Sequence, residues 1–207
     1  KSYDAGSSLS QKIIAGVDKL ADNVASTLGP RGRNVIIKQA GKRPIITKDG
    51  VTVAEFVDLD DPFEDVGAQI IKQASRQTNT VAGDGTTTAT VLARAILHGA
   101  QRHIVAGASP IDVKREIDAT VEDYVKNLKE MARPIQSEED IAHIATISAN
   151  NDETIGKLVA KAVDCVGKDG SISVEEARSL ETSLDLTEGF RFDSGYTATA
   201  FINDERR

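Results

Sequence analysis

The sequence has little cysteine, few aromatic residues and no long apolar run. Its 207 residues include one cysteine, Cys165, no tryptophan and only 4% aromatic residues. One cysteine excludes an internal disulfide framework and fits a reducing compartment. Its spacing from Ile155, Leu158 and Ala162 predicts a small apolar core residue rather than a reactive thiol. No apolar run approaches the roughly 20 residues that span a bilayer, and no signal-peptide pattern is present, so we expect a soluble, intracellular protein without a membrane partner.

Basic residues are also in the minority. The 32 acidic and 25 basic residues give a formal net charge of -7. Attraction to a phosphate backbone is therefore weak overall, and nucleic acid is not an expected partner. Hydrophobic residues make up 40% of the chain and charged ones 28%, which is typical of a globular protein. The length exceeds the common domain size of about 100 to 150 residues, which allows one large domain or two segments.

Apolar residues recur every three or four positions in several segments, which predicts amphipathic helices. The first covers about residues 10–28 and is stopped by Gly29 and Pro30. Another begins at Pro62, and the clearest is SPIDVKREIDATVEDYVKNLKEM, in which Ser109 is the expected cap. The remaining expected helices are one opened by VAGDGTTTATVLARAIL at 81–97, one led by SEED at 137–140 with the spacing of a capping box, and one over about 153–166 that ends at Gly167.

β-Branched residues predict strands in two parts of the chain. NVIIK and PIITKDGVTVAEFV, with a break at Asp49 and Gly50, predict a pair of strands around a turn. SISVEE, LDLTEG and FRFDSG predict further strands near the C-terminal end. Arg133 and Pro134 interrupt the helical pattern, so a segment boundary is expected near 131–136.

The stretch VAGDGTTTATVLARAIL places Gly83, Asp84 and Gly85 and then three threonines directly before a helix. First-turn amides of a helix have no intrahelical partners, and glycines allow a ligand to approach the backbone, so this arrangement suits phosphate. An acid beside phosphate is expected to hold a bridging magnesium ion. No lysine follows Gly85, which disfavours a Walker-type ATPase. On local spacing alone, it remains open whether Asp84 or Thr86 only caps the helix and the glycines only make a turn.

Two more turns carry similar chemistry. TLGPRGRNV at 27–35 follows a helix directly, and TKDG at 47–50 places an acid in a tight turn. Together with AGDGTTTATVLARAI and ATISANNDETIGKL, these motifs closely resemble the N-terminal part of the GroEL-type group I chaperonins, in the family's order and at its spacing. The resemblance covers essentially the whole chain.

The resemblance implies a multi-domain chaperonin fold. Residues 1–130 would form the N-terminal part of a mostly α-helical equatorial ATP-binding domain. Residues 131–188 would form the ascending part of an α/β intermediate hinge domain, and residues 189–207 the beginning of an α/β apical domain. In the family the chain continues and returns to complete these domains. We therefore expect that a chain ending at Arg207 would neither form stable rings nor hydrolyse ATP at a useful rate.

The resemblance also assigns a nucleotide site. Asp84 matches the family's magnesium ligand, and the family uses ATP, Mg²⁺ and a monovalent cation, here expected to be K⁺ near Thr27, Lys48 and Thr87. Asp49 matches an acid beside the attacking water, where it would orient or activate that water for phosphoryl transfer. The full set of positions that match nucleotide-binding residues is Thr27, Leu28, Gly29, Pro30, Lys48, Asp84, Gly85, Thr86, Thr87, Thr88, Ile147 and Ser148.

The apical residues match the family less closely. Tyr196 and Phe201 correspond to its apolar polypeptide-binding surface, but could equally be core residues. YTATAFIN carries Thr199 and Ala200 where the family has another aromatic contact, and Ser194 stands at a common intersubunit arginine.

Other charged and titratable residues have less specific interpretations. Arg31 and Arg33 suit solvated or intersubunit ion pairs as well as they suit phosphate. The three histidines show no metal-ligand spacing; they are His98, His103 and His143.

The expected protein is thus an ATP-dependent chaperonin that binds non-native polypeptides and promotes their folding in a ring-shaped chamber. Its expected partners are like subunits in heptameric rings, single or double, and a lid co-chaperonin of the GroES type. The alternative is a truncated chaperonin-like protein that binds polypeptide or partner subunits without ATP turnover. The expected location is the cytoplasm of a bacterial or phage-infected cell, with a mitochondrial or plastid matrix as the alternative.

Overall fold

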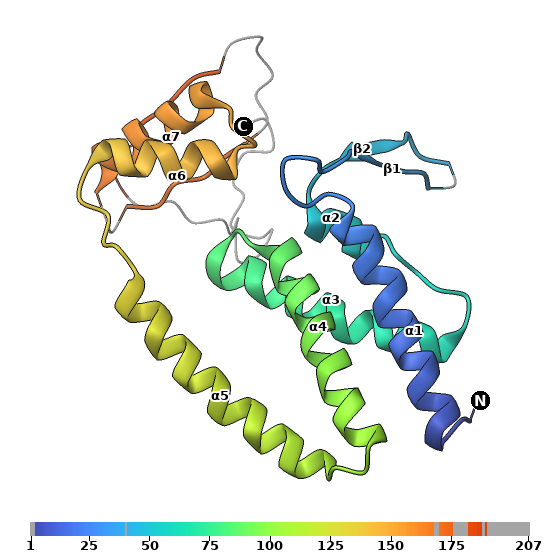
Figure 1. Ribbon diagram of the computed structural model, residues 1–207. Coiled ribbons are helices and arrows are strands. Elements are labelled where there is room, and N and C mark those ends of the chain that lie inside the picture. The colour runs from blue at the N-terminus through green and yellow to red at the C-terminus, as the bar shows by residue number, and fades with distance from the viewer. Residues whose placement is uncertain (1–2, 40, 168–169, 176–181, 188, 190–207) are drawn as a thin grey trace, which may run out of the picture. The chain divides into compact units, whose positions relative to one another are not determined.

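The structure, a computed structural model, describes residues 3–39, 41–167, 170–175, 182–187 and 189 (Figure 1). The chain divides into two compact units, Lys1–Ala132 and Arg133–Arg207, which are described separately below. The elements of the first unit are α1 (Gly6–Ala25), β1 (Val35–Ile37), β2 (Ile45–Thr47), α2 (Gly50–Glu55), α3 (Pro62–Ala82), α4 (Thr86–Val105) and α5 (Pro110–Met131). Those of the second unit are α6 (Glu138–Ser148) and α7 (Glu153–Val166).

Helices α1 to α4 form the packed part of the first unit. Helices α1, α3 and α4 pack against one another, and the short α2 contacts all three. The buried core is made of small and medium apolar side chains from α1, α2 and α3: Val17, Leu20, Val24, Val53, Ala54, Ala68 and Ile71. Helices α1 and α3 approach closely, since a Cβ on Gly16 would lie 1.8 Å from the Glu64 carbonyl oxygen. The packed helices therefore fix the positions of the loops at their ends.

The predicted end of α1 differs from the structure, whereas the predicted start of α3 agrees with it. Helix α1 ends at Ala25 instead of Leu28, and Leu28 lies in the following turn with 45% of its surface exposed. The prediction that a helix begins at Pro62 is confirmed, because Asp61 caps α3 by accepting hydrogen bonds from the amides of Phe63 and Glu64.

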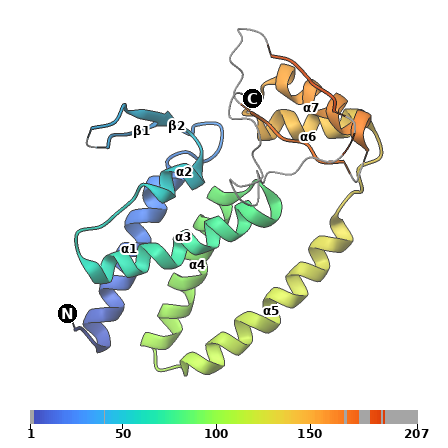
Figure 2. The same ribbon diagram turned by 180° about the vertical axis from the view of Figure 1, so that it is seen from behind.

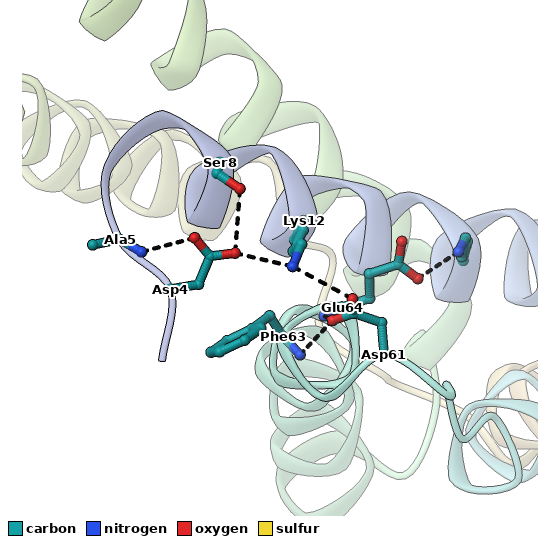
Figure 3. Close-up of polar contacts among 8 residues, drawn as sticks. Asp4, Ala5, Ser8, Lys12, Asp61, Phe63 and Glu64 are labelled. Carbon is teal, nitrogen blue, oxygen red and sulfur yellow. Dashed lines mark hydrogen bonds and ion pairs between the residues drawn. The ribbon is translucent and has the colours of Figure 1, made fainter. Parts of the chain in front are cut away.

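Ion pairs join the N-terminal ends of α1 and α3 (Figure 3). Lys12 Nζ lies 2.9 Å from Asp4 and 3.6 Å from Asp61, and 5.1 Å from the centre of the Phe63 ring. The hydrogen bond from Lys12 lowers the pKa of Asp4, and the Phe63 amide lowers the pKa of Asp61. The same carboxylates raise the pKa of Lys12, with Asp4 the larger cause. All three groups lie near water, so their contribution to stability is small.

The predicted strand pair is correct only in its first half. Strands β1 and β2 pair antiparallel, with Val35 opposite Thr47 and Ile37 opposite Ile45. The prediction that residues after Asp49 continue as a strand is wrong, because residues 50–55 form α2. Asp49 caps this helix, and Val53 and Ala54 are buried in the helical core. Burial and capping therefore override the β propensity of the segment.

Helix α5 runs along the outside of the first unit (Figures 1 and 2). It has no buried residue, and Ser109 at its N-cap makes no side-chain capping bond, unlike the prediction. An apolar groove of about 610 Å³ lies between α4 and α5, with Ile96, Ile117 and Val121 among its lining residues. Within the described residues, the apolar face of α5 is therefore only partly covered.

The second unit is built on α6 and α7, which pack together. The predicted capping box is confirmed, since the Ser137 side chain accepts a hydrogen bond from the Asp140 amide. The helix predicted to end at Gly167 is confirmed as α7. Cys165 is exposed, so its assignment to the core is wrong. The buried residues of this helix are the smaller Gly156, Ala160 and Ala162.

The described residues after Gly167 contain none of the strands expected there. Residues 170–175 and 182–187 form no strand, because a strand needs a hydrogen-bonded neighbour and the described residues supply none there. FRFDSG at 190–195 lies outside the described residues. No helix in the described part of the chain has the length and apolar character needed to cross a membrane.

Candidate functional site

The TKDG and GDGTTT segments meet at one end of the α1–α4 bundle. Gly50 is buried, and a Cβ at this position would lie 2.1 Å from Thr87 Oγ1 and 3.2 Å from Val24 Cγ1. Thr87 belongs to the first turn of α4, and Val24 precedes the TLGP loop by three residues. Close approach at Gly50 therefore brings together three segments that are separate in the sequence.

Asp49 is held by the start of α2. Its Oδ2 accepts hydrogen bonds from the Thr52 amide, at 2.9 Å, and from the Thr52 hydroxyl, at 2.5 Å. Its own amide donates to Thr47 Oγ1 at 3.0 Å. The residue is exposed, although its neighbour Gly50 is buried. A carboxylate in this position has a fixed side chain and contact with water, as a water-positioning group requires.

Two glycines in the left-handed conformation shape the turn between α3 and α4. Gly83 has φ of 71° and Gly85 has φ of 81°, and nothing lies within 4 Å of the Cβ position of either. Between them, Asp84 Oδ1 accepts a hydrogen bond from the Gly85 amide at 2.6 Å. Gly85 is the N-cap of α4 and has no side chain to bind the amides of the first turn. The open space beside this backbone suits an anionic ligand.

The three threonines of the motif have different surroundings. Thr86 is 6% exposed, so its side chain belongs to the packing of α4, and its carbonyl accepts a 2.9 Å hydrogen bond from the Thr90 hydroxyl. Thr87 is half-buried against Gly50, and Thr88 is exposed. Thr87 and Thr88 are therefore the two hydroxyls with access to solvent.

The TLGP loop is a closed turn after α1. The Gly32 amide donates to the Gly29 carbonyl at 2.9 Å, and the Arg33 amide donates to the Ser26 carbonyl at the same distance. Thr27 Oγ1 donates back to the Val24 carbonyl at 2.8 Å. The exposed members of the loop are Leu28, Gly29 and Pro30. The loop therefore presents backbone to solvent close to Val24, which contacts the Gly50 position.

The remaining predicted residues fall in different parts of the chain. Lys48 is exposed beside Asp49. Ile147, 69% exposed, and Ser148 lie in the last turn of α6, in the second unit. Tyr196 and Phe201 lie outside the described residues.

The donor set fits a metal that the substrate helps to bind. Among the described residues, no group of three or more histidine, cysteine, aspartate or glutamate side chains could hold a metal ion. Asp84 alone supplies one hard carboxylate next to an open helix N-terminus. Mg²⁺ commonly binds through one or two carboxylates together with substrate phosphates and waters, so this site fits magnesium only with a phosphate ligand.

Sequence reasoning missed the packing that holds α2 in place. Gly50 was expected in a turn between strands, but the spacing from Asp49 to Thr52 is also that of a helix N-cap. The predicted site residues do not include Lys72, which lies on the same face of α3 as Ala68 and Ser75 and is 2% exposed. A lysine within an apolar helical stripe is the signal that could have found it.

Comparison with known proteins agrees with the arrangement of these elements. Residues 20–205 match the TCP-1/cpn60 chaperonin family. A group III chaperonin in the open state is 26% identical, with a TM-score of 0.64. The chaperonin gp146 from the bacteriophage EL 2 (Pseudomonas aeruginosa), in the presence of ATP-BeFx, is 29% identical, with a TM-score of 0.63.

These similarities extend over most of this sequence but over a minor part of the relatives. Each match covers 76% of this chain, and 31% or 28% of the other chain. The chain thus spans about a third of the chaperonins it resembles. The mostly helical first unit has the chaperonin fold. The family match over residues 20–205 shows that this chain belongs to the TCP-1/cpn60 chaperonin family.

Proposed function

We propose that the natural polypeptide containing these residues is a chaperonin subunit that binds and hydrolyses Mg·ATP at this end of the α1–α4 bundle. The observation that carries the proposal is the close approach of Gly50 to Thr87, which places the Asp49 turn against the first turn of α4. Two sequence motifs with complementary chemistry therefore share one site. The presence of ATP-BeFx with the similar phage chaperonin supports a nucleotide as the ligand.

Binding of the phosphates is assigned to the backbone of the turn at 83–88. The amides of the first turn of α4 and the hydroxyls of Thr87 and Thr88 donate to phosphate oxygens, aided by the positive end of the helix dipole. The open positions beside Gly83 and Gly85 leave room for the phosphates to approach. The exposed TLGP loop, around Gly29, lines the nucleotide on the other side.

The metal is assigned to Asp84. The Mg²⁺ ion that Asp84 would hold would supply positive charge to neutralise the phosphates in the transition state. Asp84 supplies its carboxylate for this ion and is oriented by the hydrogen bond from the Gly85 amide. Asp84 is thus a binding residue, and its loss removes both the ion and the alignment of the phosphates.

Asp49 is the proposed catalytic residue. Both of its hydrogen bonds from Thr52 use Oδ2. In the proposal Oδ1 accepts a hydrogen bond from the attacking water and takes its proton as the water oxygen bonds to the γ-phosphorus. The bond from the γ-phosphorus to the β,γ-bridging oxygen breaks in the same step, and ADP leaves with that oxygen.

The rest of the function follows from a group I assignment within the family. The subunit assembles with like subunits into heptameric rings, binds non-native polypeptides through an apical surface that includes Tyr196 and Phe201, and takes a GroES-type lid. Thr27, Lys48 and Thr87 would hold a K⁺ ion that assists nucleotide binding, and Ile147 and Ser148 would link the nucleotide to hinge closure. The proposed location is the cytoplasm.

The test is ATP binding and phosphate release by the natural polypeptide, with and without Mg²⁺. We expect magnesium-dependent binding and turnover, both lost in Asp84→Ala. Tight binding of polypeptide with no ATP turnover by the unaltered protein would instead support the binding-only alternative. Refolding of a denatured client protein, with and without ATP, then separates a chaperonin from an ATPase of another kind.

A further inference from the structure

Helix α2 connects the candidate site to a set of charged residues on α3. Its N-terminal end carries Asp49 and Gly50, and its C-terminal residue is Glu55. The helix is six residues long, so its position is set by tertiary contacts rather than by its own stability. Its middle is fixed by Val53 and Ala54, which are buried in the core. Figures 1 and 2 show α2 beside the C-terminal end of α1.

Two cations of α3 hold the C-terminal end of α2. Lys72 is 2% exposed, and its Nζ lies 3.4 Å from the Glu55 carbonyl oxygen and 3.3 Å from Asp58 Oδ1. Arg76, one turn further along α3, makes a two-pronged ion pair with the Glu55 carboxylate. The backbone and the side chain of Glu55 are thus bound by separate cations. We call Lys72 and Arg76 the α3 latch.

The charge of Lys72 needs a physical reason, because burying a lysine is costly unless its charge is paired. Its nearest carboxylate, on Asp58, has a side chain that is 86% exposed, which makes a poor ion-pairing partner for stability. The other contact, with the last carbonyl of α2, satisfies the negative end of that helix. The geometry therefore favours the positioning of α2 as the reason for the buried charge.

We propose that the α3 latch is a positioning device that fixes the orientation of α2 and thereby places the Asp49 carboxylate for ATP hydrolysis. The proposal rests on the proposed function, and Lys72 and Arg76 act through α2 without touching the nucleotide. Rotation of α2 about its buried centre would move Asp49 at one end when the other end is released. A displacement of about 1 Å at a reacting group can cost roughly a hundredfold in rate. In agreement with a close ion pair, Arg76 lowers the pKa of Glu55.

The main test compares Lys72→Met with Lys19→Met in the natural polypeptide. Lys19 is half-exposed and forms its ion pair with Glu64 between α1 and α3, so it is a control for loss of a lysine charge at an ion pair that does not involve Glu55. For Lys72→Met we expect kcat to fall about tenfold to a hundredfold with KM for ATP within about threefold. Lys19→Met is expected to leave both constants within about twofold. Equal effects of the two variants, or a parallel change of kcat and KM, would overturn the proposal.

A second measurement follows α2 directly, without ATP. Hydrogen exchange of a peptide covering residues 49–57 reports the Val53 amide, which donates to the Asp49 carbonyl at 3.0 Å. We expect exchange about tenfold faster in Lys72→Met and unchanged in Lys19→Met. If Lys72→Met does not fold, Arg76→Gln removes the latch contact with the Glu55 carboxylate, where the arginine is half-exposed. Unchanged exchange and unchanged kcat in Arg76→Gln would reject the latch.

A double-mutant cycle separates this proposal from the proposed function. If the latch acts through Asp49, Lys72→Met has no further effect on kcat, within about twofold, in an Asp49→Asn background. The same loss in both backgrounds would mean that Lys72 acts by another route. An Asp49→Asn variant with full kcat would instead show that the catalytic assignment itself is wrong, and the latch proposal would fail with it.

Discussion

Helices α1 and α5 have similar lengths, 20 and 22 residues, and both carry apolar residues on one face. Helix α1 contacts α2, α3 and α4 and buries Val17, Leu20 and Val24 completely. Helix α5 packs mainly against α4 and buries no residue. An apolar face in the sequence therefore predicts an amphipathic helix, but it does not predict which neighbouring element covers that face. The candidate site lies where helices are fixed by several neighbours, as a precise site requires.

The largest expected effect on ATP hydrolysis comes from substitution of Asp84, in the turn between α3 and α4. Asp84→Ala should lower magnesium-dependent ATP hydrolysis about a thousandfold or more, because the transition-state charge loses its metal. Asp123→Ala, an exposed acid on α5, is the control and should leave turnover unchanged. Phosphate release measured on folded protein checks both. Normal turnover in Asp84→Ala would remove the metal-ligand assignment.

The second prediction compares the two helices directly by stability. Leu20→Ala should reduce the free energy of unfolding by about 2 to 5 kcal/mol, because it leaves a cavity in the core. Leu128→Ala on α5, where the side chain is 61% exposed, should cost less than about 1 kcal/mol. Denaturant unfolding of both variants measures the difference. A similar cost for both would show that the α5 face is covered in the natural protein.

The third prediction separates chemistry from capping at Asp49. Asp49→Asn keeps a good helix N-cap but removes the carboxylate. The free energy of unfolding should therefore change little, and the Kd for nucleotide should stay within a few fold. Hydrolysis should fall by roughly two orders of magnitude, the usual effect of losing a positioned base. Nucleotide titration and single-turnover kinetics check the two parts. Loss of affinity in parallel with rate would make Asp49 a binding residue.

The fourth prediction tests the close approach that brings the motifs together. Gly50→Ala places a Cβ 2.1 Å from Thr87 Oγ1, so it should destabilise the protein by about 1 to 3 kcal/mol through overpacking. Thr87→Ala removes that oxygen, so the same glycine substitution should cost less in the Thr87→Ala background. Denaturation of the four proteins gives the coupling. Additive costs would mean that the two residues are not in contact.

The smallest effect is expected from acid at the N-terminal ion pairs. The lowered pKa values of Asp4 and Asp61 mean that their contribution to stability is present above the ordinary value of 3.8 and is lost as pH falls through the folded-state pKa. Lys12→Met should therefore make the loss of stability in acid slightly smaller. Melting temperatures between about pH 6 and pH 3 check this. An unchanged acid profile in Lys12→Met would show that Lys12 does not lower these pKa values.

Local signals predicted the helices well where the determining residues are close in the sequence. Pro62 and Ser137 mark helix starts, and Gly167 marks a helix end, because caps act within one turn. The strand expected after Asp49 was wrong because Val53 and Ala54 are buried by helices distant in the sequence. The exposure of Cys165 was missed for a similar reason, since periodicity shows a helical face but not its neighbour.

The candidate site shows the same division between local and distant information. Motif spacing found Asp84 and the threonines, and the structure adds that Thr86 is buried while Thr87 meets Gly50. No spacing rule could place Gly50 beside Thr87, because the contact depends on how α2 packs against α4. The latch on α3 was missed for the same reason. The contact between Lys72 and the Glu55 carbonyl oxygen joins residues that are distant in the sequence, so only the folded structure reveals it.

The measurement that tests the central claim most directly is a structure of the natural polypeptide with Mg²⁺ and a non-hydrolysable ATP analogue. We predict the triphosphate at the N-terminus of α4, within hydrogen-bonding distance of residues 85–88, with the metal on Asp84 and a water beside Asp49. A nucleotide bound elsewhere, or phosphates out of reach of both aspartates, would contradict it.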